Sequence, residues 1–405
     1  MTTATVTASA LPLRRLRRRR SPPPMIPVHR PFLSRVDVQA VTRVLATRQI
    51  GGNGPVGRDV ERLLARQLDA PHVLLMTSCT HACQAALRAL KIGPGDEVIV
   101  PSYSYVSMAN AVLNVGARPV FVDVEPAHLT MDPAAAAAAI TPRTKALLAV
   151  HYAGYPCDMD ALTAVAKRHN LALIEDAAQA IGSALRGRAL GTIGDVGCLS
   201  FHETKNITCG EGGAFVTSHP VLAHRADLLR EKGTNRSEFL QGKVPRYEWM
   251  TEGDNYVLSE LQAALLRSQL SKLDAILTVR RRLGLRYLDR LRPLEARGVI
   301  RLPRFESAHP QVTYNWHLFY IMVQPPWRRD AVMAFLRQRR IQSTFHFIAL
   351  HTTPMGQRLH TAGPLPRAEA ADRQLLRLPL YAGLRLNDQD RVIESLAMAF
   401  AGRAA

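Results

Sequence analysis

Short apolar segments alternate with stretches of helix length from residue 72 onward, and this alternation constrains the fold more than any other feature of the sequence. Apolar runs rich in Val, Leu and Ile are typical of strands buried on both faces of a mainly parallel sheet. The runs Val196–Phe201 and Gly213–Thr217 flank a glycine-containing loop that is too short for a crossover helix, so we expect at least one antiparallel strand. The predicted strands are His72–Met76, Glu97–Val100, Pro119–Val124, Ala146–Val150, Leu171–Ile174, Val196–Phe201 and Gly213–Thr217.

The pattern changes after Asn255 and predicts a second, smaller α+β domain. We place an N-terminal arm and a large α/β domain at residues 25–270 and the small domain at residues 271–405. Residues 25–50 precede the first strand and are expected to pack back on the small domain. The elements predicted after the change are helices over Leu258–Leu273 and on to Leu291, a strand over Tyr314–Val323, a helix over Arg328–Arg339, a strand over Gln342–Phe347 and a helix over Asp388–Ala401.

Composition supports two globular domains and excludes several classes of protein. The 405 residues are 47% hydrophobic and 21% charged, as in an ordinary globular protein. No apolar run approaches the roughly 20 residues of a membrane-spanning helix. The five cysteines include no C-x-x-C pair, so we expect neither a disulfide framework nor a metal site. Sparse, unpaired cysteines are typical of a reducing compartment, so we expect a cytoplasmic protein.

The formal net charge of +19 raises the question of nucleic-acid binding. Six arginines lie within residues 1–24, which also contain three consecutive prolines and no acid, so we expect a disordered basic leader. The leader lacks the apolar stretch of a secretory signal. A transit peptide and a misassigned start upstream of Met25 both stay open, and we favour the second. The other arginines fall mostly on amphipathic helical stretches, which favours solvated faces over a nucleic-acid site.

Polar residues follow three of the predicted strands, where ligands collect in open α/β sheets. Asp176 follows one strand and Lys205 another, while Ser78, Cys79 and Thr80 follow a third and open a helix. A lysine, an acid and a helix start with hydroxyl groups are what pyridoxal phosphate (PLP) requires: a covalent anchor and proton carrier, a partner for the pyridine nitrogen and a phosphate site. Each residue alone has an ordinary alternative, since Lys205 resembles any solvated lysine and the others resemble helix caps.

The sequence around these residues resembles the DegT/StrS family of PLP-dependent nucleotide-sugar aminotransferases. The resemblance rests on Ser200–Asn206, on the glycine-rich residues 210–213 that follow and on Glu175–Gln179, and it extends from Met25 to the C-terminus. It implies the fold type I of aspartate aminotransferase: a large α/β/α domain with about seven mainly parallel strands and a small α+β C-terminal domain. It also implies a homodimer with active sites shared between the subunits.

The family's functional residues can be carried over position by position. Lys205 and Asp176 match the catalytic pair, the lysine that holds PLP and the acid at its pyridine nitrogen. Asn255 matches a residue that reaches the phosphate in the neighbouring subunit. Tyr105 matches the aromatic that stacks on the ring, with Tyr103 as the alternative. The remaining matches are Gln179 on the phenolic oxygen side of the ring, Ser200 at the phosphate, and Ser78, Cys79 and Thr80 in the phosphate-binding turn, where Cys79 replaces the family's usual small residue.

Within the family, the sequence is most similar to enzymes that form dTDP-4-amino-4,6-dideoxygalactose for surface polysaccharides. The similarity rests on Arg230–Ser237, on the residues 239–249 that follow, on Val150–Gly154 and on Phe345–His351; Asn255 departs from that subgroup. It implies amino transfer from L-glutamate to dTDP-4-keto-6-deoxy-D-glucose. Other nucleotides, other keto positions and a non-catalytic regulator stay open as alternatives.

Two other interpretations are weaker. Gly52, Gly54 and Gly57 form G-x-G-x-x-G, but the motif follows a helical stretch instead of a strand, which disfavours dinucleotide binding. A sugar dehydratase of the same family would carry histidine in place of Lys205. His202, His346 and His351 are candidates for substrate contact or for simple packing.

Overall fold

The computed structural model describes residues 24–305, 311–360 and 362–401, so nearly all of the predicted leader, residues 1–24, lies outside the described residues. Its centre is a seven-stranded sheet in the order β1-β10-β9-β6-β5-β2-β4. These strands are β1 (His72–Met76), β2 (Glu97–Pro101), β4 (Arg118–Val122), β5 (Thr144–Val150), β6 (Ala172–Asp176), β9 (Val196–Ser200) and β10 (Gly213–Thr217).

The sheet confirms the predicted α/β architecture. β10 runs antiparallel to both β1 and β9, and every other neighbouring pair is parallel. Helices cover both faces, which explains why β2, β9 and β10 are buried along their whole length. One face carries α3 (Cys79–Ala89), α4 (Val106–Asn114) and α7 (Pro220–Arg230); the other carries α2 (Pro55–Leu68), α5 (Pro133–Ala138), α6 (Met159–His169) and α9 (Glu260–Leu270).

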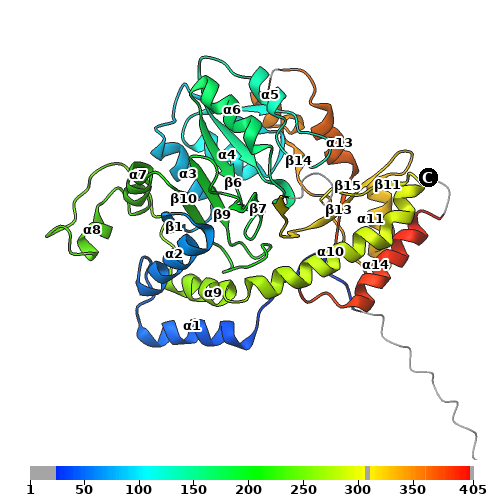
Figure 1. The fold of residues 1–405 in the computed structure, drawn as a ribbon, viewed down its shortest axis with the longest axis horizontal. Helices are drawn as coiled ribbons and strands as arrows, with labels where there is room; N and C mark the ends of the chain where they lie inside the picture. Colours follow the sequence, from blue (N-terminus) through cyan, green and yellow to red (C-terminus); the bar gives the residue numbers. More distant parts are fainter. Residues whose placement is uncertain (1–23, 306–310, 361, 402–405) are drawn as a thin grey trace, which may run out of the picture.

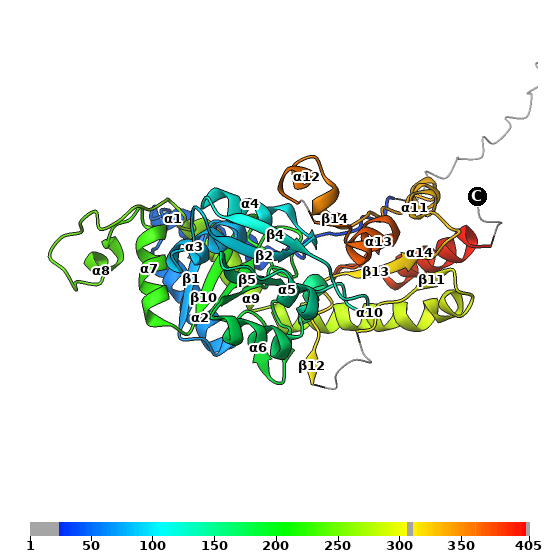
Figure 2. The same cartoon turned by 90° about the horizontal axis from the view of Figure 1, so that it is seen from above.

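The small domain is built on an antiparallel sheet in the order β11-β13-β15. The long helix α10 (Leu273–Ala296) begins three residues after α9 ends and runs from the large domain into the small one (Figure 1). The other elements are β11 (Ile300–Arg301), β13 (Phe319–Val323), β15 (Leu375–Leu378), α11 (Arg329–Gln338), α13 (Pro366–Gln374) and α14 (Leu386–Ala399). These elements lie together at one end of the molecule (Figure 2).

The predicted strand Gln342–Phe347 is wrong. Only Thr344 forms a bridge, to Arg377 of β15. The chain then leaves the small domain, and β14 (Ile348–Ala349) pairs with β3 (Tyr103–Ser104) of the large domain. Phe345 and Phe347 therefore lie where the chain crosses between the domains and not in a regular sheet. Sequence pattern alone does not distinguish these two cases.

The N-terminal arm contacts both domains. Ile26 bridges to Ile341, and Val28 accepts a hydrogen bond of 3.3 Å from the backbone N–H of Leu380, so the first residues lie on the small domain. α1 (Arg35–Thr47) lies beside α9 instead, and Asp37 holds the two together through Lys272, Ser268 and Gln269.

The remaining elements are short. Residues 236–250 project from the body of the large domain and include α8 (Arg236–Leu240) (Figure 1). Two further short strands, β7 (Ala184–Leu185) and β8 (Arg188–Ala189), form a small sheet with β12 (Val312–Thr313). The one helix not yet named among the described residues is the short α12 (Gly356–Leu359). Two short 3₁₀ turns lie at Tyr152–Gly154 and Leu350–Thr352. No helix in the described residues is both long and apolar enough to cross a membrane.

Candidate active site

A cavity of about 610 Å³ lies where the carboxyl ends of β6 and β9 face the small domain. We define its large-domain wall as the lining residues at or directly after the ends of β1, β3, β5, β6 and β9. Its small-domain wall consists of Thr344–Ile348, His317 and Arg377. Eight of the nine site residues predicted from the sequence line this cavity: Ser78, Cys79, Thr80, Tyr105, Asp176, Gln179, Ser200 and Lys205.

The N-terminus of α3 forms one end of the cavity. Ser78 caps the helix, and its hydroxyl accepts a hydrogen bond of 3.1 Å from the backbone N–H of His81. The first backbone N–H groups of a helix have no partner within it and favour an anion. β10 approaches this turn so closely that a Cβ on Gly213 would lie 2.4 Å from the Cys79 nitrogen. The turn is therefore suited to hold an anion such as a phosphate.

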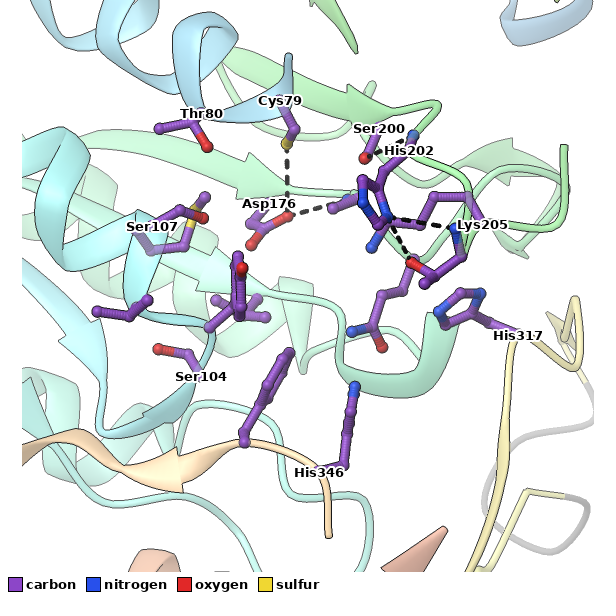
Figure 3. Close-up of a pocket in the computed structure, with 18 of the residues that line it drawn as sticks. Cys79, Thr80, Ser104, Ser107, Asp176, Ser200, His202, Lys205, His317 and His346 are labelled. Atoms are coloured by element: carbon purple, nitrogen blue, oxygen red, sulfur yellow. Dashed lines mark hydrogen bonds between the residues drawn. The ribbon is translucent and has the colours of Figure 1, made fainter. Parts of the chain in front are cut away.

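Asp176 ends β6 and is 4% exposed. One of its carboxylate oxygens accepts a hydrogen bond of 2.9 Å from the backbone N–H of Ala178. The sulfur of Cys79 lies 3.9 Å from the same oxygen, which shows that this side chain is directed at Asp176 (Figure 3). Burial raises the pKa of Asp176. A buried carboxyl of this kind is suited to share a proton with a pyridine nitrogen.

Lys205 lies in the turn after β9, where its backbone N–H donates to the carbonyl of His202 at 2.9 Å. Its side chain extends into the cavity near Asp176 (Figure 3). Burial lowers the pKa of Lys205, and the nearby Asp176 carboxylate partly opposes this. No described residue forms a hydrogen bond or ion pair with its ammonium nitrogen. The amine is thus available to a ligand and easier to deprotonate than an ordinary lysine.

Behind Asp176, a buried ion pair supports the site. His151 Nε2 lies 2.8 Å from Glu175, and both side chains are fully buried. Glu175 also accepts hydrogen bonds from the backbone N–H groups of Gly191, Ile193 and Gly194. Against the cost of burial, Cys157 and Glu175 raise the pKa of His151 to about 10. The pair anchors the end of β6 and with it the neighbouring carboxylate.

Only the oxygen of the Gln179 side-chain amide is hydrogen-bonded to the described part of the chain. Its side-chain oxygen accepts a hydrogen bond of 2.7 Å from the backbone N–H of Ala153. Because an amide side chain also carries two N–H donors, these remain to contact a ligand in the cavity.

The structure separates the two tyrosines that the sequence left open. Tyr105 precedes α4, is 58% exposed and lines the cavity. Tyr103 is fully buried, and its hydroxyl donates to the backbone carbonyl of His346 at 2.5 Å. Tyr105 is therefore the residue placed to contact a flat ring.

Asn255 is the one predicted site residue that does not line the cavity. It is exposed and bridges to Glu231 at the base of the projecting residues 236–250.

The small-domain wall was largely missed by the sequence reasoning. The Tyr152 hydroxyl lies 2.9 Å from His346 Nδ1, and the His346 ring stacks on Phe347 with centroids 4.1 Å apart. His346 faces Cys79 and Thr80 across the cavity (Figure 3). Neither Arg377 nor His317 stood out in the sequence, because each reaches the cavity from a strand or loop remote from the motifs.

Comparison with known proteins identifies the family. Residues 33–397 match the DegT/DnrJ/EryC1/StrS aminotransferase family. The chain belongs to this family. It is a PLP-dependent aminotransferase of fold type I.

Solved structures agree with this assignment. The aminotransferase TlmJ from Streptoalloteichus hindustanus is 32% identical, with a TM-score of 0.85 over 93% of this chain and 99% of that one. DesV from S. venezuelae, solved with a ketimine intermediate, is 38% identical, with a TM-score of 0.80 over 90% of this chain and 95% of that one. The putative sugar aminotransferase Spr1654 from Streptococcus pneumoniae, in its PLP form, is 26% identical, with a TM-score of 0.83 over 93% of this chain and 98% of that one.

The cavity fits PLP on its own chemistry. PLP carries a phosphate, a basic ring nitrogen and an aldehyde that reacts with an amine. The open N-terminus of α3, the buried Asp176 carboxyl and the unpartnered Lys205 amine meet these three requirements within one cavity. In the described part of the chain, no group of three or more histidines, cysteines or acids is placed to hold a metal ion.

Proposed function

We propose that this aminotransferase transfers the amino group of L-glutamate to the C4 keto group of dTDP-4-keto-6-deoxy-D-glucose, giving dTDP-4-amino-4,6-dideoxy-D-galactose. The observation that carries the proposal is the meeting of Asp176, Lys205 and the α3 N-terminus in a cavity bordered by two of the sequence segments most similar to enzymes of that specificity. These segments, Val150–Gly154 and Phe345–His351, are two of those on which the similarity rests, together with Arg230–Ser237 and residues 239–249; His151, His346 and Phe347 from them line the cavity.

The sugar class has further support. The family is that of sugar aminotransferases, and one similar structure, PseC from Helicobacter pylori, belongs to pseudoaminic acid biosynthesis. The exact sugar and nucleotide rest on the sequence similarity alone.

The chain's residues divide the work as follows. Bound PLP supplies an electron sink for the carbon that loses a proton. Lys205 anchors the cofactor and then, as a free amine, takes a proton from the donor's Cα and later delivers one to the sugar carbon. Its lowered pKa favours the neutral amine that this role requires. Asp176 keeps the ring nitrogen protonated, and the Gln179 amide orients the ring from its oxygen side.

Ser78, Thr80 and Ser200 contribute hydroxyl groups to the phosphate site, together with the first N–H groups of α3. Tyr105 covers the open face of the ring. Because Tyr105 is 58% exposed, its outer side is open to contact with a substrate or with a second subunit.

We further propose a homodimer in which Asn255 completes the phosphate site of the other subunit, since it does not line the cavity of its own subunit. Mixing inactive Lys205→Ala and Asn255→Ala subunits tests this. One site per mixed dimer retains both residues, so about a quarter of all sites should regain activity after random re-association. No recovery would refute the shared site.

The substrate is tested by incubating the PLP-loaded enzyme with L-glutamate and dTDP-, UDP- and GDP-linked 4-keto-6-deoxy sugars. We expect the dTDP-linked sugar to give amino-sugar product at the highest rate. NMR of that product should show the galacto configuration at C4. Preference for another nucleotide or another keto position would overturn the specific substrate, and no amino sugar from any of them would overturn the sugar proposal.

A further inference from the structure

Arg377 carries a buried positive charge that no described residue neutralises. It is the third residue of β15, is 8% exposed and lines the cavity. Its Nε is buried without a hydrogen-bond partner. Within residues 24–305, 311–360 and 362–401, no carboxylate forms an ion pair with its guanidinium.

Other buried arginines of this chain are satisfied. Arg230 lies 2.6 Å from Glu61 and 2.8 Å from Asp227. Arg280 donates to the backbone carbonyls of Trp316 and His317. An unpaired buried cation is strongly destabilising, as is a buried ion pair from which one partner has been removed. The cavity side of Arg377 is thus a place where an anionic ligand would be strongly favoured.

The position of Arg377 is fixed by its backbone. β13 pairs with it on one side through Tyr320, and on the other side Thr344 exchanges two backbone hydrogen bonds with it, at 2.8 and 3.3 Å. Its charge is felt across the cavity, since burial together with Lys205 and Arg377 lowers the pKa of both His317 and His346. Both imidazoles are therefore neutral near pH 7 and add no positive charge beside Arg377.

Two anions other than the donor carboxylate have a weaker claim on this charge. The cofactor phosphate has its own site at the N-terminus of α3, on the large-domain wall. The diphosphate of a nucleotide sugar is separated from a C4 keto group by the sugar ring. An α-amino acid, in contrast, carries a carboxylate directly on the carbon that must give its proton to Lys205.

We propose that Arg377 binds the α-carboxylate of the amino donor and so selects an amino acid as the first substrate. This assignment rests on the proposed use of an α-amino acid such as L-glutamate, but not on the identity of the sugar. The keto-sugar has no carboxylate at its reacting carbon, so Arg377 acts in one half of the reaction only.

The test compares Arg377→Met with Arg373→Met, a control on the exposed face of α13 whose arginine pairs with Glu369. The probe is 2-methyl-L-glutamate, which has the α-carboxylate but no Cα proton to lose. Its dissociation constant, measured by calorimetry on the PLP-loaded enzyme, should rise about ten- to a hundredfold in Arg377→Met, as for loss of a charge-assisted hydrogen bond. It should stay within about twofold in the control.

The unfolding midpoint distinguishes binding from a structural role. If Arg377 serves a ligand, Arg377→Met without the donor should unfold at the same temperature as the wild type or higher, because a buried unpaired charge has been removed. The probe should then raise the midpoint of the wild type and not of the variant. A variant that is destabilised without the donor and binds the probe normally would overturn the proposal.

The two half-reactions give an independent measurement. With enzyme already in the pyridoxamine form, Arg377→Met should aminate the keto-sugar at nearly the wild-type rate, while its reaction with L-glutamate slows by the factor seen in binding. Arg377→Lys, which keeps the charge but loses the planar fork, should recover part of the affinity. An equal loss in both half-reactions would refute the assignment. If the probe binds in an Arg377-dependent way but the wild-type enzyme aminates none of the keto-sugars, only the proposed sugar function is refuted.

Discussion

The two walls of the cavity are built in different ways. On the large-domain wall, Ser78, Asp176 and Lys205 each lie at or within a few residues of the end of a sheet strand. On the small-domain wall, His346 and Arg377 meet because a chain crossing between the domains pairs at Thr344 with a strand more than thirty residues later. The large-domain wall contains the parts that any PLP-dependent transamination needs. The small-domain wall contains Arg377, which we propose selects the amino donor.

The comparison teaches where specificity is found in this fold. The reaction type is set by short, local motifs at strand ends. The groups that we propose for substrate choice lie on a wall that is assembled from distant segments of a separate domain. Changes to the first wall should therefore abolish chemistry, and changes to the second should alter which molecules react.

The largest effect is expected for Lys205→Ala. Loss of the anchor and proton carrier should lower the transamination rate by about 10⁴-fold, the upper range for a general acid–base group. The visible absorption of lysine-bound PLP should disappear as well. Lys167→Ala, at an exposed position on α6, serves as the control and should change neither. A Lys205→Ala enzyme that kept this absorption would show that the anchor is elsewhere.

Breaking the buried pair behind the large-domain wall should cost stability. Glu175→Gln leaves His151 buried without its charged partner, so the free energy of unfolding should fall by about 3–5 kcal/mol in urea titrations. An equally stable variant would mean that the pair does not anchor β6.

The same pair predicts a pH dependence. Burial opposes its charge, but His151 lowers the pKa of Glu175 below 4.5, so this contribution to stability is present above pH 4.5 and is lost as the pH falls through the lower folded value. The pKa of His151 is raised from 6.5 to about 10, so its contribution is full below pH 6.5 and is lost as the pH rises toward 10. Urea titrations should show the largest stabilisation between pH 4.5 and 6.5, and Glu175→Gln should flatten this profile. A profile unchanged in the variant would contradict the prediction.

Asp176→Asn keeps the shape of the side chain and removes its charge. The rate should fall by about 10²–10³-fold, as when a preorganised electrostatic group is removed from an active site. PLP should still bind, because the phosphate site at α3 is untouched, and its retention on gel filtration is the control. A rate within tenfold of the wild type would assign the acid at the ring nitrogen to another residue.

The smallest effect is expected for a residue of the large domain that contacts the small-domain wall. Tyr152→Phe removes the 2.9 Å contact with His346 Nδ1 and should lower the free energy of unfolding by about 1 kcal/mol. The KM for the keto-sugar should change more than kcat, since His346 lines the cavity but has no proposed role in proton transfer. A fall in kcat with an unchanged KM would contradict the division between the two walls.

Much of the large domain could be predicted from the sequence because its signals are local. All seven strands of the main sheet were located to within two residues at each end, including the antiparallel β10. Polar residues directly after those strands also indicated the cavity, because the carboxyl ends of parallel strands meet at one edge. Fewer features of the small domain could be predicted from the sequence. Gln342–Phe347 contains Thr344, Phe345 and Phe347, which are residue types common in strands, and only the pairing of β14 with β3 decides that the chain crosses between domains.

The sequence by itself determined the fold class, the family and eight residues of the cavity, because strand periodicity and contiguous motifs depend on neighbours in the chain. Only the tertiary structure decided that Tyr105 and not Tyr103 faces the cavity, that Asn255 lies outside it, and that Arg377 lines it without a partner. These facts depend on which distant segments lie together and on which charges are left unpaired when they do. A buried arginine is indistinguishable in sequence from an exposed one until the strands around it are in place.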